Sequence, residues 1–279
     1  MKWTPGGRSG NLEDRRSGGG LGRSLGIGGT VIVLALSLFT GRNLFQDLGV
    51  SPGAGAGSTM TAEDSAREEP EVQFVSFVLD DAQNTWASIL PKYNAQFHPA
   101  KLVLFRNSTE SGCGMAQSAM GPFYCPLDEK VYIDLGFYDE LRKRFGASGD
   151  FAQAYVLAHE LGHHIQHLLG IDATVRDEQR ARPDLANQLS VKLELEADCF
   201  AGVWAHSTNE RNLLQAGDID EALTAASSVG DDRIQQQTTG RVNVDSFTHG
   251  SAAQRAQWFR RGFTSGDPKD CDTFANGTS

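Results

Sequence analysis

Two histidines one helical turn apart, with a glutamate directly after the first, are the residues best suited to chemistry in this chain. His159, Glu160 and His163 form the pattern His-Glu-x-x-His. On a helix, residues i and i+4 lie about 40° apart on one face, so both imidazoles could bind a single Zn²⁺ ion. Glu160 is then placed as the general base for a zinc-activated water. The spacing predicts half of a zinc hydrolase site.

A second pair at the same spacing, His163 and His167, competes for the role of metal-binding pair. No acidic residue directly follows His163, so this pair would lack a general base. We therefore favour His159 with His163. His164 is interpreted as a solvent-facing or supporting residue, and His167 as a cation at the end of the helix.

The helix that carries this motif has recognisable ends in the sequence. Asp150 followed by Gln153 forms a capping-box pattern, which indicates a helix start at the next residue. Gly170 is placed to end the helix. We expect one helix over residues 151–169, on which the histidines keep their helical spacing.

A catalytic zinc site needs a third protein ligand, and the segment Leu193–Trp204 offers one. Its acidic residues lie among apolar residues, and buried carboxylates are rare without a partner. Glu194 and Asp198 share one helical face, whereas Glu196 points about 200° away from Glu194. We expect Glu194 to bind zinc and Asp198 to accept the free N–H of a ligand histidine, with Glu196 as the rival ligand.

His249 lies at a predicted junction between a loop and a helix, after Phe247 and Thr248. A histidine at such a position could stabilise the oxyanion of a tetrahedral intermediate. From spacing alone, an isolated surface histidine is the commoner interpretation, so the sequence leaves both roles open.

The elements that must position these residues indicate an α+β fold. Residues 75–93 have helical spacing, and residues 101–105 and 131–135 resemble strands. After Asp150 the pattern is mostly helical. Strands followed by helices predict an α+β domain with a small mixed or antiparallel sheet and active-site helices behind it.

Four cysteines allow three pairings if the domain is exported. Cys113 and Cys125 flank one short loop and form the natural local pair, which leaves Cys199 for Cys271. Free buried thiols are the alternative. The absence of a Cys-x-x-Cys pattern makes a cysteine zinc site a poor interpretation.

The N-terminal part differs from the rest in charge and composition. Residues 1–23 predict a disordered basic tail, 24–41 an uncharged apolar membrane span, 42–71 a flexible linker and 72–279 one folded domain. The heavier cationic flank before the span places the N-terminus in the cytoplasm and the domain outside. The expected location is thus the cell membrane, through a single-pass helix.

Two other interpretations of residues 24–41 remain open, a cleaved signal peptide and a buried helix. The chain as a whole has a net charge of −10, which argues against general nucleic-acid binding. The expected partners are a peptide or protein substrate and the membrane, and the oligomeric state is left open.

Taken together, these motifs resemble the gluzincin metallopeptidases of the HtpX and CAAX-prenyl-protease type, and within them the neutral zinc metallopeptidase family of YpfJ-like proteins. The resemblance covers nearly the whole chain, and all four cysteines fall inside its segments. The matching segments, besides the histidine motif, are 111–114, 121–126, 131–135, 197–204 and 266–271.

The resemblance implies that residues 72–279 form a zincin-like zinc metallopeptidase domain. It also implies zinc-dependent peptide hydrolysis and a role for each site residue. It makes His159, His163 and Glu194 the Zn²⁺ ligands, Glu160 the general base, His249 the oxyanion residue, Asp198 a supporting residue, and Arg255 the residue holding the Glu194 side of the site. It also implies that residues 118–123 form an edge strand that pairs with substrate backbone. Pro122 departs from the wider class and removes one backbone donor.

The favoured function is a membrane-anchored zinc endopeptidase. The alternative from another class is a zinc-stabilised binding or regulatory protein with little proteolytic activity. A zinc hydrolase of non-peptide amides is a third possibility, but it usually needs a cysteine ligand. Cys199 points about 140° from Glu194 on the predicted helix and is badly aimed for that role.

Overall fold

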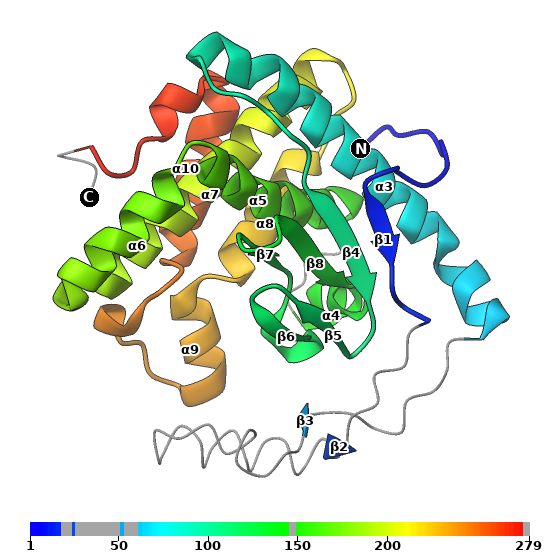
Figure 1. The fold of residues 1–279 in the computed structure, drawn as a ribbon, viewed down its shortest axis with the longest axis horizontal. Helices are drawn as coiled ribbons and strands as arrows, with labels where there is room; N and C mark the ends of the chain where they lie inside the picture. Colours follow the sequence, from blue (N-terminus) through cyan, green and yellow to red (C-terminus); the bar gives the residue numbers. More distant parts are fainter. Residues whose placement is uncertain (18–23, 26–50, 53–60, 145–148, 276–279) are drawn as a thin grey trace.

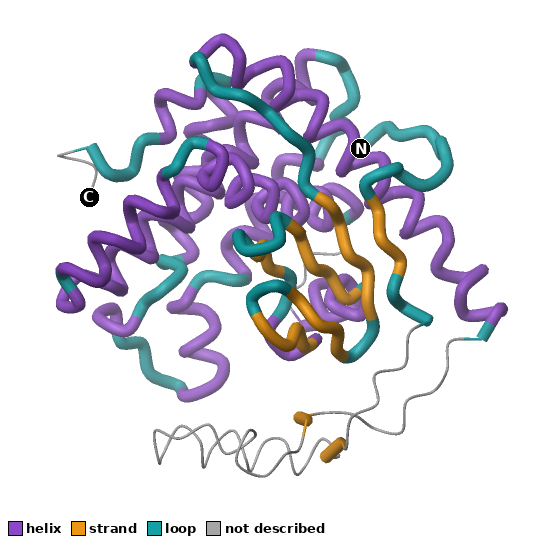
Figure 2. The backbone as a smooth tube through the Cα atoms, in the orientation of Figure 1, coloured by secondary structure: helices purple, strands orange, loops and turns teal. Residues whose placement is uncertain are grey.

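Helices dominate the computed structural model, which describes residues 1–17, 24–25, 51–52, 61–144 and 149–275 (Figure 1). The fold is α+β, and its small sheet lies to one side of the helices (Figure 2). The helices are α3 (Ala62–Ile89), α4 (Gly136–Arg144), α5 (Asp150–Leu168), α6 (Ile171–Ala181), α7 (Ala186–Glu210), α8 (Asp218–Ser228), α9 (Asp231–Thr239) and α10 (Ala252–Ser265). Short 3₁₀ helices are η1 (Leu90–Tyr93), η2 (Ser118–Met120), η3 (Pro183–Leu185), η4 (Val244–Ser246) and η5 (Pro268–Cys271).

The main sheet is mixed, with strand order β1-β4-β8-β7. Its strands are β1 (Leu12–Asp14), β4 (Lys101–Phe105), β8 (Lys130–Asp134) and β7 (Phe123–Cys125). β4 runs parallel to β1 and β8, and β7 runs antiparallel to β8. β5 (Ser108–Ser111) and β6 (Gly114–Gln117) form a separate hairpin, and β2 (Ser24–Leu25) pairs with β3 (Ser51–Pro52). The predicted α+β class and its two predicted strands are confirmed.

Alternate residues of the central strands fill two separate cores, as the two-residue period of a strand requires. On one face, side chains of β4 and β8 such as Leu104 and Ile133 pack with α3 and α5 in the main core. On the other face, Val103 and Tyr132 pack with residues of β6 and β7. The sheet is therefore buried on both faces beside the helix that carries the histidine motif.

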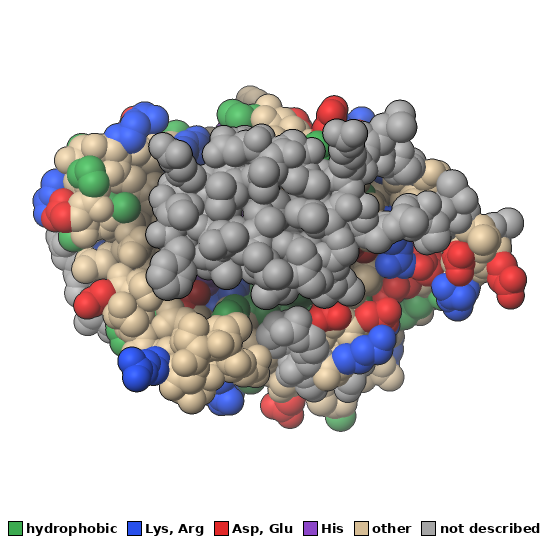
Figure 3. Space-filling model, turned by 90° about the horizontal axis from the view of Figure 1, so that it is seen from below, with side chains coloured by type: hydrophobic (Ala, Val, Ile, Leu, Met, Phe, Trp, Pro, Cys, Tyr) green, Lys and Arg blue, Asp and Glu red, His purple; other side chains and the backbone are tan. Residues whose placement is uncertain are grey.

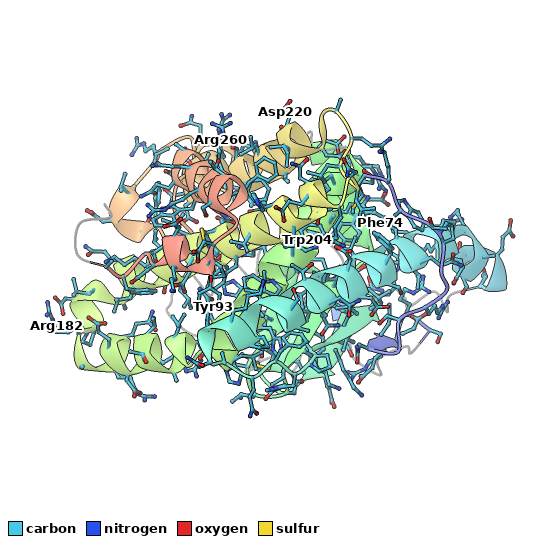
Figure 4. The ribbon with its side chains drawn as sticks, turned by 90° about the horizontal axis from the view of Figure 1, so that it is seen from above. Phe74, Tyr93, Arg182, Trp204, Asp220 and Arg260 are labelled. Carbon is cyan, nitrogen blue, oxygen red and sulfur yellow. A yellow bond between two sulfur atoms is a disulfide. The ribbon has the colours of Figure 1, made fainter. Side chains whose placement is uncertain are left out.

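Helix α7 is anchored to the rest of the core by Trp204. This side chain is fully buried and lies beside α3, where its Nε1 donates to Asp81 at 2.8 Å (Figure 4). Its ring stacks on Phe151 of α5, with centroids 5.6 Å apart. One tryptophan thus ties together α3, α5 and α7.

Helix α3 begins at Ala62, within the segment expected to be a flexible linker. Thr61 and Asp64 form a capping box, in which each side chain bonds to the other residue's backbone N–H. The helix continues through Pro70 into the predicted helix 75–93. Glu63 and Asp64 lie in the first turn of α3, so residues 62–71 of the predicted linker are helical.

Residues 1–17, expected to belong to a disordered tail, are part of the folded domain. β1 pairs with β4, and the Met1 side chain is buried in the main core. The Met1 ammonium lies 2.8 Å from Asp150 Oδ1 and 3.3 Å from Asp218 Oδ1. The basic residues that suggested a tail bind acidic partners instead; Arg16 pairs with Glu68 of α3 at 2.8 Å. Acidic and basic side chains mix at the right-hand end of the face in Figure 3.

The predicted membrane span and the single-pass location are corrected. Among the described residues, no helix has both the length and the apolar character needed to cross a membrane. Ser24–Leu25 form β2, and residues 26–41 of the predicted span lie outside the described residues. The predicted sidedness fails for a second reason. Strands of one sheet occupy one compartment, so β1 and the peptidase domain cannot lie on opposite sides of a membrane.

Both predicted disulfides are present. Cys113, at the turn of the β5–β6 hairpin, is bonded to Cys125 at the end of β7. Cys199 of α7 is bonded to Cys271 of η5, and both residues are fully buried. The first bond fixes the hairpin against the edge of the main sheet, and the second holds the C-terminal segment on α7.

Candidate metal centre

The histidine motif lies in the middle of α5, as its spacing predicts, but the helix starts differently. Gly149 is the N-cap residue, and Glu221 of α8 accepts the backbone N–H of Phe151 in the first turn at 3.2 Å. The Asp150 carboxylate, expected to be the cap, is bound by the Met1 ammonium instead. At the other end Gly170 adopts the left-handed conformation with φ 73°, as a residue ending a helix often does.

Gly162, inside the motif, allows α5 and α7 to come into contact. A Cβ atom at this position would lie 2.9 Å from the carbonyl oxygen of Ala197 and 3.1 Å from its Cα. Such distances leave no room for a side chain, so the glycine is required by the close approach of two backbones. This approach brings the Glu194 turn of α7 against the two histidines of α5.

His159, His163 and Glu194 converge to form a three-residue cluster. His159 Nε2 lies 3.2 Å from Glu194 Oε2, and His163 Nε2 lies 3.4 Å from Glu194 Oε1. One donor atom from each residue lies within 4.8 Å of the others. Two imidazole nitrogens and one carboxylate oxygen form a donor set that suits a catalytic zinc ion with an open coordination position. The residues therefore fit the metal.

The close contact of these three residues shifts the pKa of each one. Burial would raise the pKa of Glu194, but the neighbouring histidines outweigh burial and hold that pKa well below its ordinary value. Burial lowers the pKa of His159, whereas Asp198 and Glu194 raise it to about 10. Burial also lowers the pKa of His163, and Glu194 raises it above its ordinary value. Because metal ligands must be deprotonated, metal binding at this cluster would release protons.

Asp198 orients the His159 ring through its Nδ1 atom. Its Oδ1 lies 2.9 Å from His159 Nδ1, so this carboxylate can accept the N–H that leaves Nε2 free for a metal. Arg255 grips the same carboxylate twice, through Nε at 2.8 Å and Nη2 at 3.0 Å, and Tyr155 OH also donates to Asp198. All three supporting groups are buried. Arg255 was expected to hold the Glu194 side; it holds Asp198 instead.

Glu196, the rival ligand, lies apart from the three-residue cluster. Its Oε2 accepts from Gln166 Nε2 at 2.9 Å, and Gln166 Oε1 lies 2.8 Å from His163 Nδ1. Burial raises the pKa of Glu196 to about 8. Gln166 therefore orients the His163 ring through Nδ1, as Asp198 orients the His159 ring. Sequence reasoning missed it, although its position one turn after His163 was a usable signal.

Glu160 is buried and lines the same cleft as the three-residue cluster. Burial, the largest influence, raises the pKa of its carboxyl, against the lowering effect of the two histidines. A carboxylate whose proton affinity is raised in this way suits the acceptance of a proton from water.

His249 also lines this cleft, and Asp231 holds it there. Asp231 Oδ2 accepts the backbone N–H of His249 at 2.6 Å, and Oδ1 lies 3.2 Å from His249 Nδ1. The hydrogen bond to Asp231 is the largest influence on His249 and raises the pKa of the imidazole. No sequence signal pointed to Asp231, which begins α9, 18 residues before His249.

The cleft has a volume of about 950 Å³ and runs between the sheet side and α9. The expected edge strand over 118–123 is only partly present. Ser118–Met120 form η2, Gly121 follows with φ 76°, and the edge strand β7 begins at Phe123. Pro122 and the positive φ of Gly121 explain the late start, because neither residue suits a continuous ladder.

Comparison with known proteins agrees with this donor set. Residues 1–274 match the family described as "Putative neutral zinc metallopeptidase". The chain belongs to this family. It is 47% identical over 283 residues to "Uncharacterized protein YpfJ" of Escherichia coli (strain K12), covering 98% of this chain and 99% of that protein.

A mycobacterial relative is similar over a shorter part. The chain is 46% identical over 201 residues to "Uncharacterized protein Rv2575" of Mycobacterium tuberculosis (strain ATCC 25618 / H37Rv), covering 68% of this chain and 66% of that protein. No solved structure matches. The family description names zinc and peptidase activity, and both relatives are named as uncharacterized proteins.

Proposed function

We propose that the protein is a zinc endopeptidase whose metal is held by His159, His163 and Glu194. The observation that carries this proposal is the convergence of the three donor atoms within 4.8 Å in a cleft that also contains Glu160. When bound, zinc would supply Lewis acidity, which polarises a peptide carbonyl and makes water more acidic. The remaining chemistry belongs to side chains of the chain.

Glu160 accepts the proton of the attacking water and delivers it to the leaving amine. The raised pKa of its buried carboxyl favours the first transfer. His249, kept protonated by Asp231, donates a hydrogen bond to the oxyanion that develops on the scissile carbonyl. Asp198 and Arg255 keep the His159 ring in a fixed orientation during both transfers.

Substrate binding in an extended conformation along β7 accounts for endopeptidase specificity. β7 is the edge strand of the main sheet, and its residues Phe123 and Tyr124 line the cleft. An extended peptide can add to such an edge through backbone hydrogen bonds. The absence of an N–H at Pro122 limits this pairing to the backbone from Phe123 onward.

We also propose that the family lies within the gluzincins, near the HtpX and CAAX-prenyl-protease type. The supporting feature is the third ligand, a glutamate from a second helix, followed one turn later by the aspartate that orients a ligand histidine. This arrangement joins Glu194 and Asp198 of α7 to His159 of α5.

The test combines metal analysis with digestion of casein and a peptide library. The purified protein should contain one zinc ion and cleave internal peptide bonds. Glu160→Gln should keep its zinc and lose activity by several orders of magnitude, because it removes a base and not a ligand. A zinc-containing wild-type protein that binds peptides without cleaving any would support the regulatory alternative. Equal loss of zinc in Glu160→Gln and His163→Ala would disprove the assigned roles.

A further inference from the structure

Two large apolar side chains are exposed in the cleft and come from different elements. Met120, at the end of η2 on the sheet side, is 62% exposed, and Ile234 of α9 is 37% exposed. In Figure 1, α9 lies to the left of the sheet. Phe137 and Val156 also line the cleft.

The arginines of the cleft are already held by carboxylates of the chain. Arg106 lies 3.6 Å from Asp134 Oδ1 and also pairs with Glu68. Arg176 lies 2.7 Å from Asp172 Oδ2, and Arg255 is bound to Asp198. A compensated arginine attracts an acidic substrate weakly, because binding would break an existing ion pair.

A single apolar side chain exposed on an open surface is common and needs no partner, whereas ligand clefts are lined predominantly by apolar side chains that contact the ligand. Within the described residues, seven large apolar side chains are exposed, and two of these, Met120 and Ile234, line the cleft. Both line the cleft that contains the proposed zinc ligands, where the side chains of a bound peptide would contact them.

We propose that Met120 and Ile234 determine specificity, so that the cleft selects peptides with large apolar residues next to the scissile bond. This inference rests on the proposed peptidase function and names its substrate class. Apolar contacts supply the selection, and the compensated arginines leave acidic side chains without a strong attraction. Removing or replacing one such contact typically changes discrimination by about 10- to 200-fold.

Cleavage of a fluorogenic peptide library tests the proposal. The two residues flanking the scissile bond are varied among Leu, Phe, Lys and Glu. We expect wild-type kcat/KM to be at least about tenfold higher for Leu and Phe than for Lys and Glu. Met120→Glu and Ile234→Glu should each lower kcat/KM for the apolar peptides by about tenfold and raise it for Lys peptides, with unchanged zinc content.

Two control variants add the same charge outside the cleft. Leu127 is 77% exposed and Val244 is 68% exposed, and neither lines the cleft. Leu127→Glu and Val244→Glu should leave the order of preference unchanged. A wild-type preference for charged residues, or cleft variants that keep the wild-type order, would overturn the proposal.

A binding measurement separates this proposal from the peptidase function itself. Fluorescence anisotropy with zinc-loaded Glu160→Gln protein compares a Leu-rich and a Lys-rich peptide of equal length. If wild type cleaves nothing, the proposed catalytic function fails. Tighter binding of the Leu-rich peptide, lost on adding Met120→Glu but not Leu127→Glu, would still support apolar selection. Equal binding of the two peptides would refute it.

Discussion

Asp231 and His249 form a two-point contact at the rim of the candidate metal centre. One carboxylate oxygen accepts the His249 backbone N–H at 2.6 Å, and the other lies 3.2 Å from the ring Nδ1. The same carboxylate accepts the backbone N–H groups of Thr248 and Gly250, at 2.7 and 3.1 Å. The loop that presents His249 is therefore built around one acidic side chain, which also sets the protonation of the imidazole.

Replacing Asp231 should change the pH dependence of peptide hydrolysis. The pKa of His249 is raised mainly by its hydrogen bond to Asp231, so the protonated donor persists to higher pH. Activity falls as pH rises through that pKa. In Asp231→Asn the pKa drops, and the alkaline limb of the kcat profile should move to lower pH, with a loss of about 10- to 100-fold in kcat at neutral pH.

Zinc content measured by mass spectrometry should be unchanged in Asp231→Asn, because Asp231 contacts none of the three proposed ligands. Asp220→Asn, on the exposed side of α8, is a charge-matched control and should behave as wild type. An alkaline limb that stays in place would show that His249 is not the titrating donor.

Glu194 and Glu196 should differ sharply in their effect on zinc affinity. Glu194 belongs to the three-residue cluster, whereas Glu196 reaches His163 only through Gln166. Glu196→Ala should weaken zinc binding by at most about 10- to 100-fold, the usual effect of a residue that orients a ligand. Glu194→Ala should weaken it considerably more. Competition with a chelating dye measures the zinc affinity of both variants. A larger loss in Glu196→Ala than in Glu194→Ala would mean that Glu196, on the other face of α7, is the third ligand.

Gly162→Ala should destabilise the protein and weaken zinc binding together. Alanine is favoured over glycine within a helix by about 1 kcal/mol. Here its Cβ would meet the Ala197 backbone at 2.9 and 3.1 Å, and overpacking of this kind costs about 1–3 kcal/mol. Moving α7 away from α5 would also displace Glu194 from the histidines.

Thermal unfolding and zinc titration of Gly162→Ala measure the two effects. Gly10→Ala is the control, because a Cβ at Gly10 would meet no atom within 4 Å. If Gly162→Ala raised the melting temperature, the helices would have room to adjust and the close approach would not be a constraint.

Loss of the Cys199–Cys271 bond should cost more stability than loss of the Cys113–Cys125 bond. Their sequence separations are 72 and 12 residues, for which restriction of the unfolded chain gives about 4 and about 3 kcal/mol. Double Ser variants of each pair, unfolded in urea, measure the difference. Because Cys199 directly follows Asp198 on α7, the Cys199–Cys271 variant should also retain zinc less well. Equal zinc retention in both variants would show that the Cys199–Cys271 bond does not support the metal centre.

Features set by the periodicity of one helix could be predicted from the sequence. The four-residue spacing alone places His159 and His163 on one helical face. It does the same for Glu194 and Asp198. The same periodicity favours Glu194 over Glu196 as the third ligand. In the structure, Glu196 accepts a hydrogen bond from Gln166. Such relationships need no knowledge of the neighbouring elements.

The sequence also identified segments whose composition misled the interpretation. The arginines of residues 1–17 suggested a disordered tail, but a basic segment orders when acidic partners such as Glu68 are present. An acidic stretch after residue 61 suggested a linker, although Thr61 and Asp64 cap a helix there. Composition describes a segment in isolation, whereas the partners that bind it come from elsewhere in the chain.

By itself, therefore, the sequence determined the α+β class, the histidine motif and the shared helical face of Glu194 and Asp198, and it favoured the cysteine pairing that the structure shows. Only the tertiary structure decided that Arg255 holds Asp198 rather than the Glu194 side, that Asp231 positions His249, and that β1 joins the sheet. The physical reason is that spacing along one helix is fixed by its hydrogen bonds. Distances between elements depend on how side chains pack, as at Gly162, and no local pattern records that packing.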